Sequence, residues 1–143
     1  MPNPVVVGVD GSATALKAAK VARELAVSLG APLLVVSAFD NDRTEVMRTG
    51  NEEFVLSAAD DAERVARSVA DELRGDRLQV KHSAAHGKPA EALVAEASRV
   101  DARLIVVGNR RMRGIGRVLG SIANSVAHSA SCDVYIANTY DTE

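Results

Sequence analysis

The chain has 143 residues, of which 47% are hydrophobic and 25% charged, and its formal net charge is −2. This length suffices for a core of its own, so we expect a single domain over residues 1–143. A slightly acidic chain with 3% aromatic residues and no Trp is atypical of proteins that bind nucleic acids or anionic membranes. The single cysteine, Cys132, cannot form an internal disulfide, and the first apolar run is too short for a signal peptide. We therefore expect a cytoplasmic protein.

The first half of the chain alternates between apolar and amphipathic segments. Residues 4–9 are apolar and rich in β-branched side chains, which predicts a buried strand ending at Asp10. Ser12 is a good N-cap, and the apolar spacing predicts a helix from there to about Leu29, with Gly30 at its C-terminal end. A second strand at 32–39, a polar loop at 40–50 and a second helix at 51–74 follow.

The second half of the chain repeats this alternation. Residues 78–85 alternate in polarity, which predicts an edge strand. A third helix is predicted to begin at Gly87-Lys88-Pro89, because the missing N–H of Pro89 leaves no hydrogen bond unmade in the first turn of a helix. Further strands are predicted at 104–107 and 133–137, with a helix at 121–129 between them. The polar tail 138–143 is expected to fray.

The strand–helix alternation predicts an α/β fold, a three-layer sandwich around a five-stranded parallel sheet that is doubly wound. In the expected strand order 3-2-1-4-5, the winding reverses between the first and fourth strands. Ligands of such sheets bind outside the carboxyl ends of the strands at this reversal. The loops that follow these two strands are therefore the candidate binding segments.

The longer of these loops, residues 108–121, has the composition of an anion-binding site. Glycines let backbone N–H groups approach a phosphate, a helix start at Gly120-Ser121 favours negative charge, and arginines add positive charge. The alternative is a glycine-rich turn that only connects a strand to a helix. The spacing matches neither a P-loop nor the dinucleotide fingerprint. The glycines are Gly108, Gly114, Gly116 and Gly120, and the arginines are Arg110, Arg111, Arg113 and Arg117.

Four segments stand out together, in chain order: residues 6–12 (VVGVDGS), 87–93 (GKPAEAL), 106–109 (VVGN) followed by 120–123 (GSIA), and 132–136 (CDVYI). This set of segments resembles the universal stress protein family. The resemblance implies an adenine nucleotide alpha hydrolase-like fold that binds ATP or another adenine nucleotide, AMP and cyclic AMP included. Mg²⁺ on the phosphates is an open option.

The resemblance also implies site residues and a partner. Family members commonly form a homodimer through the last strand, and here the apolar edge strand 134–137 needs a cover. The implied nucleotide-binding residues are Gly8, Val9 and Asp10 at the base or ribose, Ala38 and Phe39 at the adenine, Val107, Gly108, Asn109, Arg110 and Arg111 in the signature loop, and Gly120, Ser121 and Ile122 at the phosphates.

The loop departs from the family signature at one place. Nucleotide-binding members have Gly, two residues, Gly, nine residues and then Gly-Ser/Thr. Here Arg111 replaces the second Gly, and eight residues separate it from Gly120. This departure leaves three alternatives. The Arg111 side chain folds outward, the arginines bind the phosphates by charge, or the site no longer binds ATP. We expect retained binding, because the other matching residues are intact and positive charge suits an anion.

The sequence thus predicts an adenine-nucleotide-binding stress-response protein that acts as a sensor or regulatory module. Two alternatives stay open: a nucleotide-free dimeric interaction protein with a closed site, and a slow ATPase. An enzyme is disfavoured, because the loop has no Lys and no residue is evident that orients an attacking water, so no catalytic residue is assigned. His82, His86 and His128 share no metal-ligand spacing, so no metal site in the protein is expected.

Overall fold

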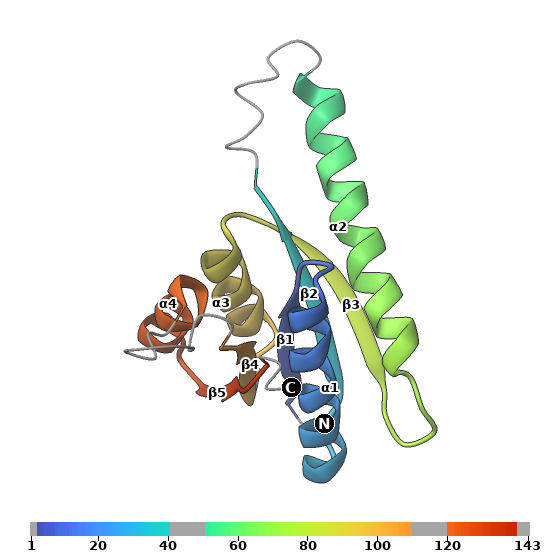
Figure 1. The fold of residues 1–143 in the computed structure, drawn as a ribbon, viewed down its shortest axis with the longest axis vertical. Coiled ribbons are helices and arrows are strands. Elements are labelled where there is room, and N and C mark those ends of the chain that lie inside the picture. Colours follow the sequence, from blue (N-terminus) through green and yellow to red (C-terminus); the bar gives the residue numbers. More distant parts are fainter. Residues whose placement is uncertain (1–2, 41–50, 110–119, 140–143) are drawn as a thin grey trace.

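The computed structural model describes residues 3–40, 51–109 and 120–139, with side chains from residue 58 onward in the second range. Within these ranges five strands alternate with four helices (Figure 1), which confirms the predicted order of elements. The elements are β1 (Val5–Val9), α1 (Ala13–Leu29), β2 (Leu33–Phe39), α2 (Asn51–Leu73), β3 (Val80–His86), α3 (Pro89–Arg99), β4 (Leu104–Gly108), α4 (Ser121–Ser129) and β5 (Asp133–Ala137).

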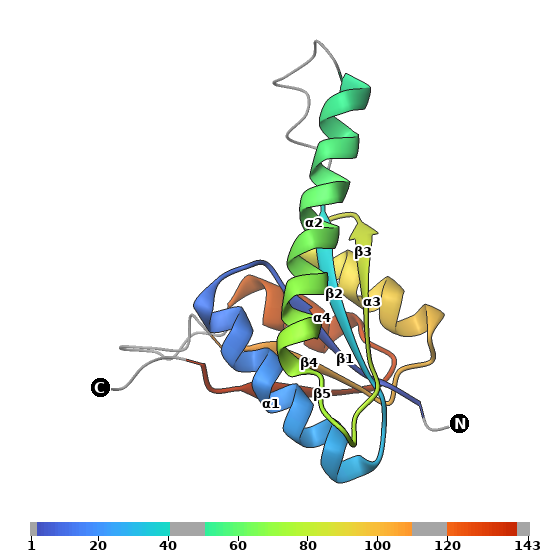
Figure 2. The same ribbon diagram turned by 90° about the vertical axis from the view of Figure 1, so that its right-hand side faces the viewer.

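The strands form one parallel sheet in the order β3-β2-β1-β4-β5. Val5 of the central strand β1 is in register with Leu33 of β2 on one side and with Leu104 of β4 on the other. In Figure 2, α1 and α2 lie in front of the sheet and α3 and α4 lie behind it. The predicted three-layer α/β sandwich, its strand order and the reversal between β1 and β4 are confirmed.

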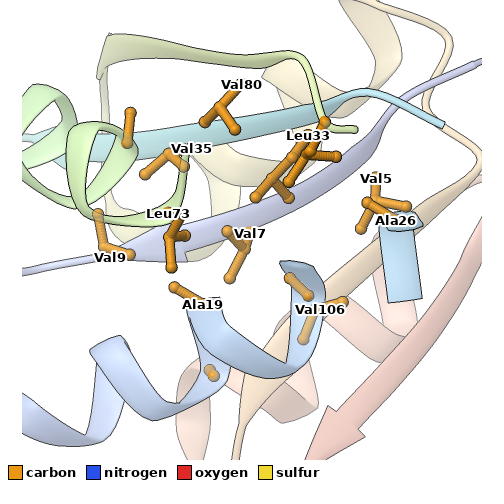
Figure 3. Packing of buried hydrophobic residues seen from close by; sticks show 14 of the residues in the cluster. Val5, Val7, Val9, Ala19, Ala26, Leu33, Val35, Leu73, Val80 and Val106 are labelled. Carbon is orange, nitrogen blue, oxygen red and sulfur yellow. The ribbon is translucent and has the colours of Figure 1, made fainter. Parts of the chain in front are cut away.

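The core between the sheet and the α1–α2 layer is aliphatic (Figure 3). Val5, Val7 and Val9 of β1 all point into it, because successive residues of a strand face opposite sides of the sheet. The face of α1 that meets the sheet is made of alanines, whose small side chains allow close packing of the helix on the strands. These alanines are Ala18, Ala19, Ala22 and Ala26.

The opposite face of β1 presents Val6 and then Gly8 to the α3–α4 layer, where Leu93 of α3 and Val126 of α4 are buried. A Cβ at Gly8 would lie 3.1 Å from Cδ2 of Leu93. The missing side chain therefore lets α3 approach the sheet and leaves room near the carboxyl end of β1.

Two predictions about element boundaries are wrong. β3 begins at Val80 instead of residue 78, because Leu78 is held in a tight turn, where its N–H donates to the Gly75 carbonyl (3.4 Å). The tail does not fray at once after β5, since Thr139 is fully buried. None of the helices in the described ranges is long and apolar enough to cross a membrane.

Candidate functional site

A cavity of about 180 Å³ lies at the carboxyl ends of β1 and β4, at the reversal of the sheet. The carboxyl-terminal parts of β1, β2 and β4 meet there with the N-terminal parts of α1, α3 and α4, and with Thr139 from the segment after β5. The lining residues are Gly8, Val9 and Asp10; Val36 and Ala38; Val107 and Gly108; Ser12, Thr14, Ala15 and Ala18; Pro89 and Leu93; Gly120, Ser121, Ile122 and Ala123; and Thr139.

Most of the site residues predicted from the sequence border this cavity. Arg110 and Arg111 lie outside the described residues, as do Arg113 and Arg117. Two further predicted residues, Phe39 and Asn109, are not among those that line it. The predicted residues that do line it are Gly8, Val9, Asp10, Ala38, Val107, Gly108, Gly120, Ser121 and Ile122.

Phe39 and Asn109 lie elsewhere for separate reasons. Phe39 follows Ala38 in β2 and so faces the other side of the sheet, where its ring makes an edge contact with the ring of His86 at a centroid distance of 5.3 Å. Asn109 is buried, with 4% exposure, and its side chain hydrogen-bonds to Thr139. Adjacent sequence positions therefore have different surroundings in the fold.

The β2 side of the cavity is apolar. Val36 and Ala38 come from β2, and Pro89 and Leu93 come from the first turns of α3. Pro89 occupies the first turn of α3, where its fixed φ suits the helix and its missing N–H leaves no intrahelical bond unmade. These side chains make a wall suited to a flat apolar group, such as the face of a heterocyclic base.

The β4 side of the cavity carries the N-terminus of α4. The N-cap residue is Gly120, which has no side chain to accept a hydrogen bond from the N–H groups of the first turn. The helix dipole and these N–H groups favour a negatively charged group at this end. The Ser121 hydroxyl adds a further polar group at the cavity. This end of the cavity is therefore suited to an anion such as a phosphate.

The N-terminus of α1 is capped by the side chain of its N-cap residue, Ser12. Ser12 Oγ accepts a hydrogen bond from the Ala15 N–H (3.1 Å), and Asp10 Oδ1 accepts one from the Ser12 N–H (2.9 Å). The Thr14 hydroxyl lies 3.2 Å from Ser12 Oγ. The sequence identified Ser12 as a helix cap but not as part of the cavity wall, because only the packing of α1 on β1 and β4 brings its first turn there.

The described wall of the cavity carries little ionisable chemistry. Asp10 is the one ionisable side chain among the described residues that line the cavity. Within the described ranges, no group of three His, Cys, Asp or Glu side chains is placed to hold a metal ion. The chemistry that these residues offer is binding through apolar contact, backbone N–H groups and hydroxyls.

Comparison with known proteins identifies the family. A model of the universal stress protein family matches residues 1–138. The chain belongs to the universal stress protein family. It is 33% identical over 140 residues to a universal stress protein of Thermus aquaticus, and the match covers 95% of this chain and 98% of that protein. It is 32% identical over 140 residues to the universal stress protein Rv2005c of Mycobacterium tuberculosis, and that match covers 94% of this chain but only 45% of the longer protein.

Solved structures of universal stress proteins share the fold. One, a crystal structure in complex with cAMP, has a TM-score of 0.74 and 29% identity, and the match covers 96% of this chain and 98% of that one. Another, from Archaeoglobus fulgidus in complex with dAMP, has a TM-score of 0.68 and 26% identity, with 94% and 96% of the two chains covered. The resemblance that the four sequence segments indicated is thus confirmed.

Proposed function

We propose that this universal stress protein binds an adenine nucleotide in the cavity at the ends of β1 and β4. The observation that carries the proposal is the polarity of the cavity, which is apolar on the β2 and α3 side and has the uncapped N-terminus of α4 on the other. A nucleotide has the same two parts, a flat base and an anionic phosphate. Two relatives with this fold have solved structures in complex with cAMP and dAMP, which supports the same proposal.

In this proposal the base packs against Ala38 and Leu93, and the phosphates meet the first turn of α4. AMP, cyclic AMP and ATP all have these two parts. The arginines at 110, 111, 113 and 117 directly precede this turn in the sequence and add positive charge for the longer phosphate chain of ATP. We propose that Arg111, in place of the family's second Gly, supports phosphate binding through this charge.

Mg²⁺ would enter with the nucleotide. Asp10 is the one carboxylate at the described cavity wall, and Mg²⁺ prefers several oxygen ligands, so phosphate oxygens must supply most of its coordination. Asp10 and the Ser121 hydroxyl are among the groups of this wall with the right chemistry to add oxygen ligands. When bound, the ion would neutralise phosphate charge.

We further propose that the protein acts as a sensor or regulatory module and that a second copy pairs with it at β5. β5 is an edge strand, and Tyr135 on it is 44% exposed. An unpaired edge with an exposed aromatic side chain favours pairing with another strand. Sedimentation of the purified protein tests this part, and a monomer at all concentrations would contradict it.

The test of nucleotide binding is calorimetric titration with AMP, cyclic AMP and ATP, the last with and without Mg²⁺. Ser121→Asp places a carboxylate at the first residue of α4, where it stabilises the helix but repels a phosphate. We expect at least about tenfold weaker binding, equivalent to about 1.4 kcal/mol. Ser125→Asp is the matched control, because it makes the same change at an exposed position of α4 that does not line the cavity.

The outcomes separate the alternatives. Saturable binding that Ser121→Asp weakens and Ser125→Asp preserves supports the proposal. If none of the three nucleotides binds at millimolar concentration, the nucleotide-free interaction protein is the better description. Release of phosphate from ATP that survives purification and is lost in Ser121→Asp would favour the slow ATPase.

A further inference from the structure

Two buried polar residues, Asn109 and Thr139, lie beyond the ends of β4 and β5, and Thr139 borders the cavity. Asn109 follows the last residue of β4 and is 4% exposed, and Thr139 follows β5 and is 0% exposed. They are thirty positions apart in the sequence, and α4 and β5 lie between them. Polar side chains are buried at a cost unless they are hydrogen-bonded, so their contacts have to be accounted for.

The two residues satisfy each other. Asn109 Oδ1 accepts hydrogen bonds from the Thr139 backbone N–H (2.7 Å) and from the Thr139 hydroxyl (3.2 Å). A carboxamide oxygen has two lone pairs, and both are used here. Asn109 Nδ2 donates to Asn138 Oδ1 at 3.3 Å. The carboxamide thus holds two successive residues of the segment that follows β5.

Thr139 is also part of the cavity boundary. Its side chain packs on Gly108, where a Cβ would lie only 3.0 Å from Thr139 Cγ2 and 3.2 Å from Oγ1. The sheet pairing between β4 and β5 ends at Gly108 and Ala137, so no strand hydrogen bond of the β4–β5 ladder holds Thr139 in place. Asn109 supplies the contact that the sheet no longer provides.

We propose that Asn109 is a positioning residue of the nucleotide site, which acts by anchoring Thr139 against Gly108 so that the Thr139 side chain forms part of the cavity wall on the β4 side. This inference rests on the proposed nucleotide binding and adds to it a wall residue that the family signature does not contain. Asn109 itself does not touch the nucleotide. The Thr139 side chain forms the wall through its volume, and its hydroxyl adds a second hydrogen bond to Asn109.

Four variants, measured by calorimetry with AMP, test the assignment. Asn109→Ala removes the anchor, and Thr139→Gly removes the wall. Each is expected to weaken AMP binding about tenfold, the effect of losing one well-packed contact region. Thr139→Val keeps the volume of the side chain and the shorter backbone N–H bond to Asn109 (2.7 Å) and loses only the hydroxyl bond (3.2 Å), so it should weaken AMP binding less than Thr139→Gly does. Ala26→Gly lowers stability in α1 away from the cavity and should bind AMP as the wild type does.

A spectroscopic readout distinguishes a wall of the site from a general effect on folding. In ¹H–¹⁵N spectra of the labelled protein, AMP should shift the Thr139 amide signal, because this N–H sits in the anchor. The Gly30 amide, at the far end of α1, should not move.

The results that would overturn the inference differ from those that would overturn nucleotide binding. If AMP binds the wild type and all four variants alike, or leaves the Thr139 amide unshifted, the site does not use this wall and nucleotide binding stands. If Thr139→Val binds as weakly as Thr139→Gly, the shape of Thr139 is not what matters, and the wall role is wrong. If no adenine nucleotide binds the wild type, the proposed function fails and the inference fails with it.

Discussion

A single methyl group added at Gly8 tests how the cavity is built. Gly8 lies in the central strand β1, borders the cavity and faces α3. The Cβ of an alanine there would lie 3.1 Å from Cδ2 and 3.5 Å from Cδ1 of Leu93, which is itself 4% exposed and borders the cavity. At 3.1 Å the contact is too tight to keep, so the Leu93 side chain has to give way by a few tenths of an ångström. Because Leu93 borders the cavity, we expect this shift to change the shape of the cavity.

The expected cost follows from two opposing effects. Overpacking a well-packed site costs about 1–3 kcal/mol. Replacing Gly by Ala within a strand recovers about 0.5–1 kcal/mol of backbone entropy. The free energy of unfolding of Gly8→Ala should therefore fall by up to about 2.5 kcal/mol. Because a cavity of about 180 Å³ loses a methyl-sized volume and gains the displaced Leu93, AMP affinity should fall at least about tenfold.

Urea unfolding and AMP calorimetry on a double-mutant cycle provide the assay. Leu93→Val removes the two Cδ carbons that the new methyl group meets, so Gly8→Ala should cost less in the Leu93→Val background than in the wild type. A coupling free energy of about 0.5–3 kcal/mol is expected for side chains in contact. Strict additivity of the two substitutions, together with unchanged AMP affinity of Gly8→Ala, would refute this account of the contact and of the cavity.

Three further predictions concern single side chains. The hydrogen bond from Arg99, together with one from a serine hydroxyl, holds the pKa of Glu96 below its usual range. Its contribution to stability is therefore present at neutral pH and lost as pH falls below about 4.3 and through the folded-state pKa, so urea midpoints of Glu96→Gln and wild type should converge in acid. Burial, and next the charge of the following aspartate, raise the pKa of the Cys132 thiol. Alkylation by iodoacetamide at pH 7.5 should therefore be slower in the native protein than in urea, and equal rates would contradict this. Ser12→Ala removes the acceptor for the Ala15 N–H and should lower the free energy of unfolding by about 1 kcal/mol in urea titrations, whereas an unchanged midpoint would show that the cap is not needed.

The fold could be predicted because its signals are local. Residues 4–9 are apolar in succession, as a strand buried on both faces requires, and the structure buries Val5, Val6 and Val7 fully. Ser12 and Gly30 marked the ends of α1, where the structure shows the serine cap and a left-handed glycine with φ 64°. The predicted start of β3 at residue 78 is wrong, because Leu78 belongs to a turn that closes with a hydrogen bond to Gly75. The polarity of single residues does not reveal such a turn.

The site was predictable only in part. Its glycines and the Gly120-Ser121 helix start stand out in the sequence, because few other residue types allow the backbone to approach a ligand closely or suit the start of a helix that binds an anion. Phe39 was placed with Ala38, although neighbours in a strand face opposite sides of the sheet. Ser12, Thr14 and Thr139 carry no local signal for the cavity. They border it because the packing of α1 and the path of the chain after β5 bring them there.

The sequence by itself determined the class of the fold, the order of its elements, the reversal between β1 and β4 and the family, because these depend on the polarity and spacing of residues near one another in the chain. The tertiary structure decided which residues border the cavity and how Asn109 is used. Its carboxamide could as well have faced a ligand, but it is turned to Thr139, thirty positions away, where two buried donors need an acceptor. Such a choice depends on which polar groups are left unpaired once the strands have paired, and that is settled only when the whole chain has folded.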